Sequence, residues 1–270
     1  MNIQIVSDIH AEFWPNKQKF GFIIPTAPFL ALLGDTCCCG SDKDFEIFKL
    51  FIMEVVVNYK KVFIITGNHE YYYDGKSPVE YKHTIQGINE RISQFCKTDD
   101  RLCFLNNSSC LIAAGKNSYL IVGSTLWSWI PQEEHKRISN EMNDYKYTYI
   151  YDINSSNRIR RITPFDISTI HLKNCKYIRS QIKKAKDNNY KMIMLTHHKP
   201  YHSDNYNPKS ISPAYESDLI TLFKEPIIFW GYGHTHISDN KKIGETWLYS
   251  NPKGYPNQKT KFQRKQSVSF

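Results

Sequence analysis

Five short polar segments of the chain carry side chains that bind metal ions. They are Ser7-Asp8-Ile9-His10, Gly34-Asp35-Thr36, Gly67-Asn68-His69-Glu70, Thr196-His197-His198 and Gly233-His234-Thr235-His236. Each segment directly follows a short apolar run, and six of the ten histidines fall within them. An isolated Asp-x-His or Gly-Asp arises often by chance, whereas the recurrence of all five after apolar runs indicates one shared site.

The donor types in these segments point to a particular metal chemistry. In an extended segment, side chains two residues apart point the same way, so Asp8 with His10, and His234 with His236, can each grip one ion. Carboxylate, imidazole and amide donors without an obligatory thiolate suit manganese, iron or zinc better than magnesium. A shared carboxylate with ligands on both sides implies two divalent ions about 3.5 to 4 Å apart, the spacing used for displacement at phosphorus.

The elements that must position these residues can be predicted from hydrophobic patterning. Apolar runs typical of buried strands occupy residues 3–6, 29–33, 62–65, 119–122, 192–195 and 227–230. Helical spacing occurs in residues 44–59, 78–95, 164–189 and 213–223. This alternation predicts an α/β fold with much parallel pairing, in which ligands bind at the carboxyl ends of the strands. We therefore expect the five polar segments to converge on one crevice.

A second group of strands has short connections that suit antiparallel pairing. It comprises residues 102–105, 110–114, 119–122 and 246–250. The least regular stretch, residues 127–163, is rich in Tyr, Asn and Arg, and we expect loops or a lid there. No repeat or Gly/Ser linker marks a domain boundary in the 270 residues, so one core is expected.

The ordered motifs resemble those of the calcineurin-like metallophosphoesterases. Further segments similar to small, single-domain, microbial-type members of that family are residues 3–13, 67–72, 124–127, 142–145 and 251–255. The likeness covers nearly the whole chain. It implies a four-layer α/β/β/α sandwich of two mixed sheets flanked by helices, with the metal site at the C-terminal ends of the strands. It also implies a single domain over residues 1–270, with a lid-like excursion at about residues 127–163.

The resemblance implies a role for each matching position. The first metal would be held by Asp8, His10, Asp35 and His236, and the second by Asp35, Asn68, His197 and His234. His69 matches the family's catalytic histidine, which contacts the scissile phosphate and protonates or stabilises the leaving oxygen.

One position departs from the family pattern. Some members carry an aspartate three residues after the bridging carboxylate, where it orients the catalytic histidine, whereas this chain has Cys38. A neutral thiol supplies no charge, so the group that orients His69 is left open, with Glu70 as one candidate. Three consecutive cysteines do not form a zinc motif, because their side chains diverge.

Three polar residues near the motifs, His198, Asn143 and Asp144, are not predicted to bind metal. His198 is expected to support a ligand or contact substrate rather than to bind metal. Asn143 and Asp144 lie in a family-like segment without a role that the sequence defines.

Composition sets the broad class. Apolar residues make up 41% and charged residues 23% of the chain, a balance typical of a folded globular protein. The formal charge of +9 indicates an anionic partner or, equally, compositional drift on a solvated face. Seven cysteines without a framework, no leader-like start and no long apolar segment predict an unexported, cytoplasmic protein with reduced thiols and no membrane association.

The leading functional hypothesis is hydrolysis of a phosphomonoester or phosphodiester by hydroxide that two metal ions activate. A small phosphoester or nucleotide-like substrate is expected. A nuclease or cyclic-nucleotide phosphodiesterase is the alternative that the positive charge suggests, which keeps nucleic acid open as a partner, although no aromatic-plus-basic recognition motif is present. A non-catalytic scaffold of the same fold is the least favoured alternative, because every matched ligand position is retained.

Overall fold

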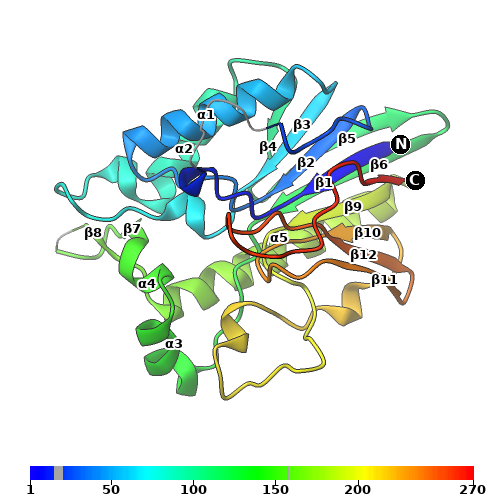
Figure 1. The fold of residues 1–270 in the computed structure, drawn as a ribbon. Helices are drawn as coiled ribbons and strands as arrows, with labels where there is room; N and C mark the ends of the chain where they lie inside the picture. The colour runs from blue at the N-terminus through cyan, green and yellow to red at the C-terminus, as the bar shows by residue number, and fades with distance from the viewer. Residues whose placement is uncertain (15–20, 157) are drawn as a thin grey trace.

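Two large mixed sheets form the centre of the computed structural model, which describes residues 1–14, 21–156 and 158–270 (Figure 1). The first sheet has the strand order β13 (Ser267–Ser269), β1 (Asn2–Val6), β2 (Phe29–Leu33), β3 (Lys61–Ile65) and β4 (Leu102–Phe104). The second has the order β11 (Asp239–Ile243), β12 (Thr246–Ser250), β10 (Ile227–Gly231), β9 (Lys191–Thr196), β6 (Asn117–Ser124) and β5 (Ser108–Ala114).

Parallel pairing dominates the middle of both sheets. Strands β1 to β4 are parallel neighbours, and β12, β10, β9 and β6 are likewise parallel. Antiparallel strands close the edges, with β13 on the first sheet and β11 and β5 on the second. Because parallel strands all end at the same edge, the segments that follow β1, β2, β3, β9 and β10 lie together.

Side chains alternate between two sides along the central strands. In β2, Leu30 and Leu32 join the core beneath the helices, while Ala31 and Leu33 pack between the two sheets. In β9, Met194 faces the outer side and its neighbours face the other sheet. Both faces of each sheet are thus buried, which explains why these strands read as continuous apolar runs.

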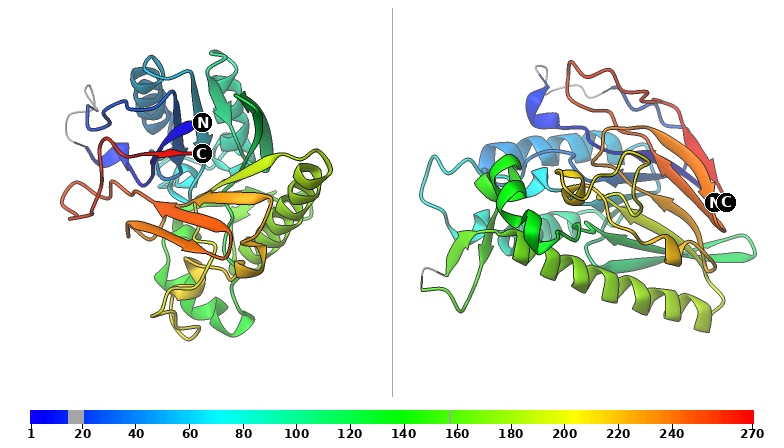
Figure 2. Two further views of the ribbon diagram at one scale, coloured as in Figure 1. Left: turned by 90° about the vertical axis from the view of Figure 1, so that its right-hand side faces the viewer. Right: turned by 90° about the horizontal axis from the view of Figure 1, so that it is seen from below.

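Helices cover the outer side of each sheet. Helices α1 (Asp42–Val56) and α2 (Ile85–Cys96) lie over the first sheet, and α5 (Pro164–Asp187) runs along the second (Figure 2). Helix α5 begins with a capping box, in which Thr163 and Asp166 satisfy each other's backbone N–H groups, followed by proline at the first helical position. The four-layer α/β/β/α sandwich is thereby confirmed.

Two predicted helices differ from the structure. Residues 213–223 are not a helix but two 3-10 turns, η5 (Ser212–Ala214) and η6 (Ile220–Leu222), because the chain between them pairs with the segment after β9 through Lys199 and Glu216. The helix expected at 78–95 begins only at Ile85, after the turn η3 (Tyr81–His83).

The antiparallel grouping is only partly right. Strands β5 and β6 do pair antiparallel, and β12 pairs antiparallel with β11, but β4 is a parallel neighbour of β3, and β12 is also parallel to β10. The segment 127–163 is more regular than expected, with α3 (His135–Glu141), α4 (Asp144–Tyr147) and a hairpin of β7 (Tyr149–Tyr151) and β8 (Ile159–Arg161). No helix in the described part of the chain is long and apolar enough to cross a bilayer.

Candidate metal centre

The segments after β1 and β10 bring together a first group of donor atoms. The Nε2 atoms of His10 and His236 lie 3.1 Å apart. His236 Nε2 lies 3.4 Å from Asp8 Oδ1, and His10 Nε2 lies 3.8 Å from Asp35 Oδ2. Asp8, His10 and His236 each offer one ligand atom, and these three atoms lie within 4.8 Å of one another, which allows one cation to contact all three.

A second group surrounds the Nε2 atom of His197. Asp35 Oδ1 lies 3.4 Å from this nitrogen, Asn68 Oδ1 lies 3.1 Å from it, and His234 Nδ1 lies 3.2 Å from it. The two oxygens of Asp35 thus face different groups, Oδ2 toward His10 and Oδ1 toward His197. The structure therefore places all seven predicted ligands as two adjoining groups that share one carboxylate; their binding of metal stays a prediction.

The hydrogen bonds behind these donors leave lone pairs directed at the centre. His197 Nδ1 lies 2.8 Å from the carbonyl oxygen of Leu33 and donates there, so in the neutral ring Nε2 is the nitrogen that can bind a cation. The Asn68 amide donates through Nδ2 to Tyr72 and to Asp144, each at 2.9 Å, which leaves Oδ1 facing His197. Partners behind a ligand fix its orientation in this way at metal sites.

Ring nitrogens that face one another support the fit of a cation. The Nε2 atoms of His10 and His236 face each other, as do His197 Nε2 and His234 Nδ1. Bringing buried lone pairs together without compensation is costly, and a positive ion between them offsets that cost. The residues present therefore fit one or two divalent ions.

The backbone of the centre adopts a conformation that most residues avoid. Five proposed ligands have φ between 50° and 69°, in the left-handed region: Asp8, His10, Asp35, His234 and His236. Such conformations cost about 1 to 3 kcal/mol each and gather at functional sites. Glycine at positions 34 and 67 allows the neighbouring loops to approach closely, since a Cβ at Gly34 would lie 2.5 Å from His197 Nδ1.

The Glu70 carboxylate ties two of the loops together. It accepts hydrogen bonds from the backbone N–H groups of Asp35, Thr36 and Gly67, at 2.9, 2.7 and 2.6 Å. Burial, followed by the charge of Asp35, raises the pKa of Glu70 to about 7. These three bonds engage both of its oxygens, so Glu70 holds the loop backbone rather than the His69 ring.

A different carboxylate lies beside His69. Glu12, in the 3-10 turn η1 (Ala11–Phe13), has its Oε1 atom 3.3 Å from His69 Nδ1. Burial raises the pKa of Glu12, but hydrogen bonds with His10 and His69 outweigh it and the net pKa is lowered. Burial lowers the pKa of His69, but Asp35 and Glu12 outweigh it and raise the pKa to about 9. Glu12 was not among the residues predicted from the sequence, although its place two residues beyond the first polar segment was a usable signal.

Asp144 is a second residue whose role the sequence did not define. Its buried carboxylate accepts hydrogen bonds from Asn68 Nδ2 and, at 2.7 Å, from the Tyr72 hydroxyl. It therefore orients the amide of a proposed metal ligand. His198 is also buried and packs its ring 4.2 Å from that of His234, while its Nδ1 lies 3.3 Å from the carbonyl of Thr125. It supports a ligand ring and does not line the cavity.

A cavity of about 270 Å³ opens onto the centre. Its lining includes three tyrosines, Tyr72, Tyr215 and Tyr255, and none of its described lining residues is a lysine or arginine. Tyr215 stacks on His234 with ring centroids 4.6 Å apart, and Tyr255 stacks on His10 at 4.3 Å. The segment 127–163 reaches this cavity through Glu141 and its two following neighbours.

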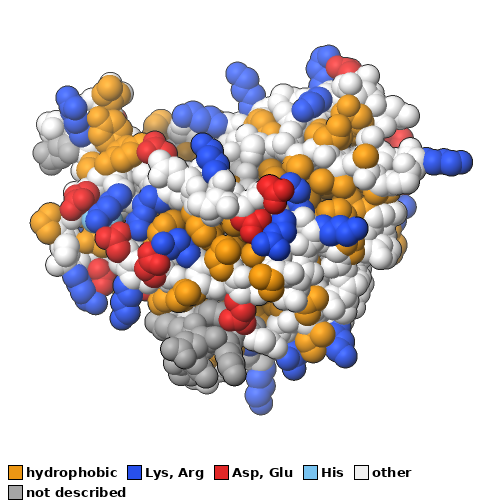
Figure 3. Space-filling view, turned by 90° about the horizontal axis from the view of Figure 1, so that it is seen from above, with side chains coloured by type: hydrophobic (Ala, Val, Ile, Leu, Met, Phe, Trp, Pro, Cys, Tyr) orange, Lys and Arg blue, Asp and Glu red, His pale blue; other side chains and the backbone are white. Residues whose placement is uncertain are grey.

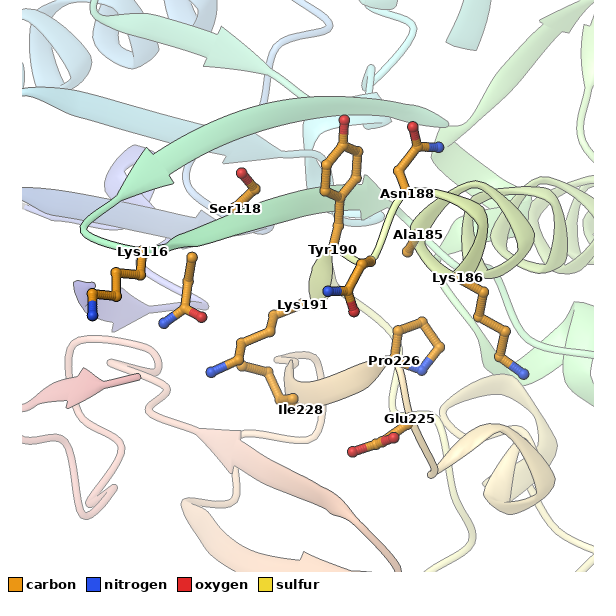
Figure 4. Close-up of a pocket in the computed structure, with 12 residues that line it drawn as sticks. Lys116, Ser118, Ala185, Lys186, Asn188, Tyr190, Lys191, Glu225, Pro226 and Ile228 are labelled. Carbon is orange, nitrogen blue, oxygen red and sulfur yellow. The ribbon is translucent and has the colours of Figure 1, made fainter.

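A larger cavity, of about 580 Å³, lies at the opposite ends of the strands (Figure 4). It is lined by Lys116, Lys186 and Lys191, and Lys191 begins the strand that His197 follows. Glu225 is the one carboxylate among its described lining residues. Without clustered imidazoles or carboxylates, that lining lacks the donors that a metal site requires.

Comparisons with known proteins agree with this architecture. A family model described as calcineurin-like phosphoesterase matches residues 1–238. The chain is 30% identical over 284 residues to "Uncharacterized protein L509" of Acanthamoeba polyphaga mimivirus, covering 96% of this chain and 93% of that protein.

Two solved structures share the fold. Phosphopantetheinyl hydrolase (PptH) from Mycobacterium tuberculosis aligns with a TM-score of 0.69 and 15% identity, over 94% of this chain and 90% of that one. TT1561 of Thermus thermophilus aligns with a TM-score of 0.51 and 14% identity, over 93% and 88% of the two chains. At such identities these matches show the fold alone.

Proposed function

The chain belongs to the calcineurin-like phosphoesterase family, and we propose that it hydrolyses phosphomonoester or phosphodiester bonds of small substrates with two divalent metal ions as cofactors. The observation that carries the proposal is the shared carboxylate of Asp35, whose oxygens face His10 on one side and His197 on the other. Manganese, iron or zinc ions in these two groups would supply a hydroxide nucleophile at neutral pH and neutralise the phosphate oxygens.

The proposed ligands divide between the two groups. Asp8, His10, Asp35 and His236 would hold the first ion, and Asp35, Asn68, His197 and His234 the second. The left-handed loops and the hydrogen bonds of Leu33 and Asp144 hold these side chains in place before any ion or substrate binds.

His69 is the proposed catalytic residue. Its ring lies at the edge of the cavity, with Nδ1 toward Glu12 and Nε2 3.4 Å from the Tyr255 hydroxyl. Nε2 is therefore the atom that faces a bound ester, and a proton held there can pass to the leaving oxygen. The Asp35 carboxylate accepts a hydrogen bond of 2.9 Å from the His69 backbone N–H, which fixes the backbone of His69 relative to the centre.

The cavity favours a small substrate. Because its described lining offers no lysine or arginine, a polyanion would find few cationic partners there besides His69 and the ions themselves. On the face drawn in Figure 3, Lys and Arg side chains are spread among Asp, Glu and hydrophobic ones rather than gathered into a basic patch. The lining of the cavity favours a small phosphoester over a polynucleotide, which needs rows of phosphate contacts.

The experiment combines metal analysis with hydrolysis of p-nitrophenyl phosphate and of its bis ester. We expect two ions per chain and turnover of at least one ester. Asp35→Asn should lower the content of both ions and abolish turnover, whereas Asp204→Asn, at an exposed position, should change neither. Metal-loaded protein that cleaves neither ester would overturn the proposal.

Nucleotide substrates discriminate the alternative function. A cyclic nucleotide and a single-stranded oligonucleotide are assayed beside the bis ester at equal concentration. Faster cleavage of either would assign the chain to the phosphodiesterases or nucleases, and the small-substrate proposal predicts slower cleavage of the oligonucleotide.

A further inference from the structure

The Glu12 carboxylate is held on both of its oxygens. Its side chain is 7% exposed. Oε2 accepts a hydrogen bond of 3.2 Å from the backbone N–H of Cys38, while Oε1 lies 3.3 Å from Cys38 Sγ and 3.3 Å from His69 Nδ1. The Glu12 carboxylate thus links the turn after β1 to the loop after β2 through Cys38, and its Oε1 atom also faces the His69 ring.

Other carboxylates near His69 are directed elsewhere. Both oxygens of Glu70 accept backbone N–H groups, and Asp35 Oδ1 bonds to the His69 backbone rather than to its ring. Among the described residues, Glu12 is the one acid within ion-pair distance of the His69 imidazole. The ring itself is held edge-on to His10, at 4.5 Å, and against Tyr72, at 4.4 Å.

We propose that Glu12 is the positioning residue for His69: by accepting a hydrogen bond from the Nδ1–H group, it fixes the ring orientation that presents Nε2 to the substrate. This inference rests on the proposed phosphoesterase function, since it concerns the histidine that serves the leaving group. It also accounts for the lack of an aspartate at position 38, because Glu12 supplies a carboxylate to the His69 ring from a different segment of the chain.

The two oxygens of Glu12 serve two different N–H groups, and a glutamine at position 12 could serve only one of them. Cys38 N and His69 Nδ1 each use a different oxygen of Glu12. An amide has one oxygen, so Glu12→Gln must leave one of these N–H groups facing an NH₂ group. The variant keeps the volume of the side chain but loses the orientation of the ring.

A carboxylate at position 38 offers a rescue. Cys38 Sγ, a Glu12 oxygen and a His69 nitrogen all lie within 4.8 Å of one another, so an aspartate in place of Cys38 reaches the same region of the ring. We expect Glu12→Gln to lower kcat on p-nitrophenyl phosphate about 10²-fold or more, with KM and metal content unchanged. The double variant with Cys38→Asp should recover at least about tenfold of that loss. Glu133→Gln, at an exposed position, is the matched control.

Metal content and a spectroscopic readout separate positioning from loss of the metal centre, because Glu12 also lies 3.6 Å from His10. Nitrogen-15 NMR of the histidines in the zinc-loaded protein, with His69 assigned from His69→Ala, should show a hydrogen-bonded Nδ1–H group in the wild type that is lost to solvent exchange in Glu12→Gln. An unchanged Nδ1–H signal, turnover within about threefold of wild type, or metal loss in step with turnover would each overturn the inference. A wild-type protein that cleaves no ester would instead refute the proposed function, and the NMR comparison would still test Glu12.

Discussion

Replacing Gly67 with alanine should damage the metal centre, although Gly67 has no side chain that binds an ion. A Cβ at this position would lie 2.2 Å from Asp35 Oδ1 and 2.7 Å from His197 Cε1. Real Cβ atoms essentially never approach other atoms within 3.0 Å. The shared carboxylate must therefore move by about 0.8 Å, the difference between the two distances, or the loop after β3 must move by as much.

A displacement of this size has a large effect on catalysis. Misplacing a reacting or positioning group by about 1 Å costs on the order of 10²-fold in rate, and overpacking a dense site destabilises a protein by about 1 to 3 kcal/mol. We expect Gly67→Ala to lose about 10²-fold in kcat on p-nitrophenyl phosphate and to bind less than two ions per chain. Turnover, metal stoichiometry and thermal unfolding are measured on the same preparation.

The chain supplies a matched control for this substitution. A Cβ at Gly21 would meet no atom of the described residues within 4 Å, so Gly21→Ala should leave turnover and metal content unchanged. Steric contact of the added Cβ with the Asp35 carboxylate is the one cause of the predicted loss. A Gly67→Ala protein with two ions and kcat within about threefold of wild type would refute it.

Three further predictions concern His69, the ions and helix α5. His69→Ala should lower kcat about 10²- to 10⁴-fold with metal content preserved; full activity would remove His69 from the mechanism. Chelation should lower the melting temperature by several degrees, because ions at about a hundred times their Kd stabilise the folded state by about 2.7 kcal/mol; identical melting with and without chelator would contradict this. Asp166→Asn should cost about 1 kcal/mol, because Asp166 caps α5 and bonds to Arg160. Burial raises the pKa of Asp166, but its bonds to Arg160 and Thr163 hold the net pKa below the ordinary value. The contribution of the Asp166 carboxylate to the free energy of unfolding is therefore fully present above about pH 4, and it is lost as the pH falls through the lowered pKa. The melting temperatures of wild type and Asp166→Asn should therefore converge in acid.

The sequence predicts the strands and their polar ends well, for a physical reason. Both faces of each sheet are buried, so central strands such as β2 (Phe29–Leu33) read as continuous apolar runs whose bounds can be recognised. The ligand loops follow directly, because parallel strands end at one edge. The sequence therefore predicts that Asp35 and His197 are neighbours. It does not predict the distance between them, which is 3.4 Å from Asp35 Oδ1 to His197 Nε2.

Contacts between distant loops could not be predicted in the same way. Glu12 is one of 26 acidic residues, and its approach to His69 depends on how the turn after β1 folds against the loop after β3. Asp144 likewise acquires its role only when α4 is placed beside Asn68. The helix expected at 213–223 failed because pairing with Lys199 outweighs local helical preference.

The left-handed backbone of the ligand loops limits how this centre can be re-engineered or can evolve. Aspartate, asparagine and histidine are the non-glycine residues that tolerate positive φ best, and aspartate and histidine are the ones found at all five left-handed ligand positions. The left-handed backbone and the coordination of metal ions therefore favour the same few residue types, namely aspartate, asparagine and histidine. Exchanging these ligands for cysteine would create a thiolate-rich centre suited to copper(I). Cysteine would be strained in the left-handed backbone at these positions, and this strain would destabilise the loops whatever the affinity for the metal. We expect variation among descendants of this sequence to exchange aspartate, asparagine and histidine at these positions and to exclude branched or sulfur-bearing side chains.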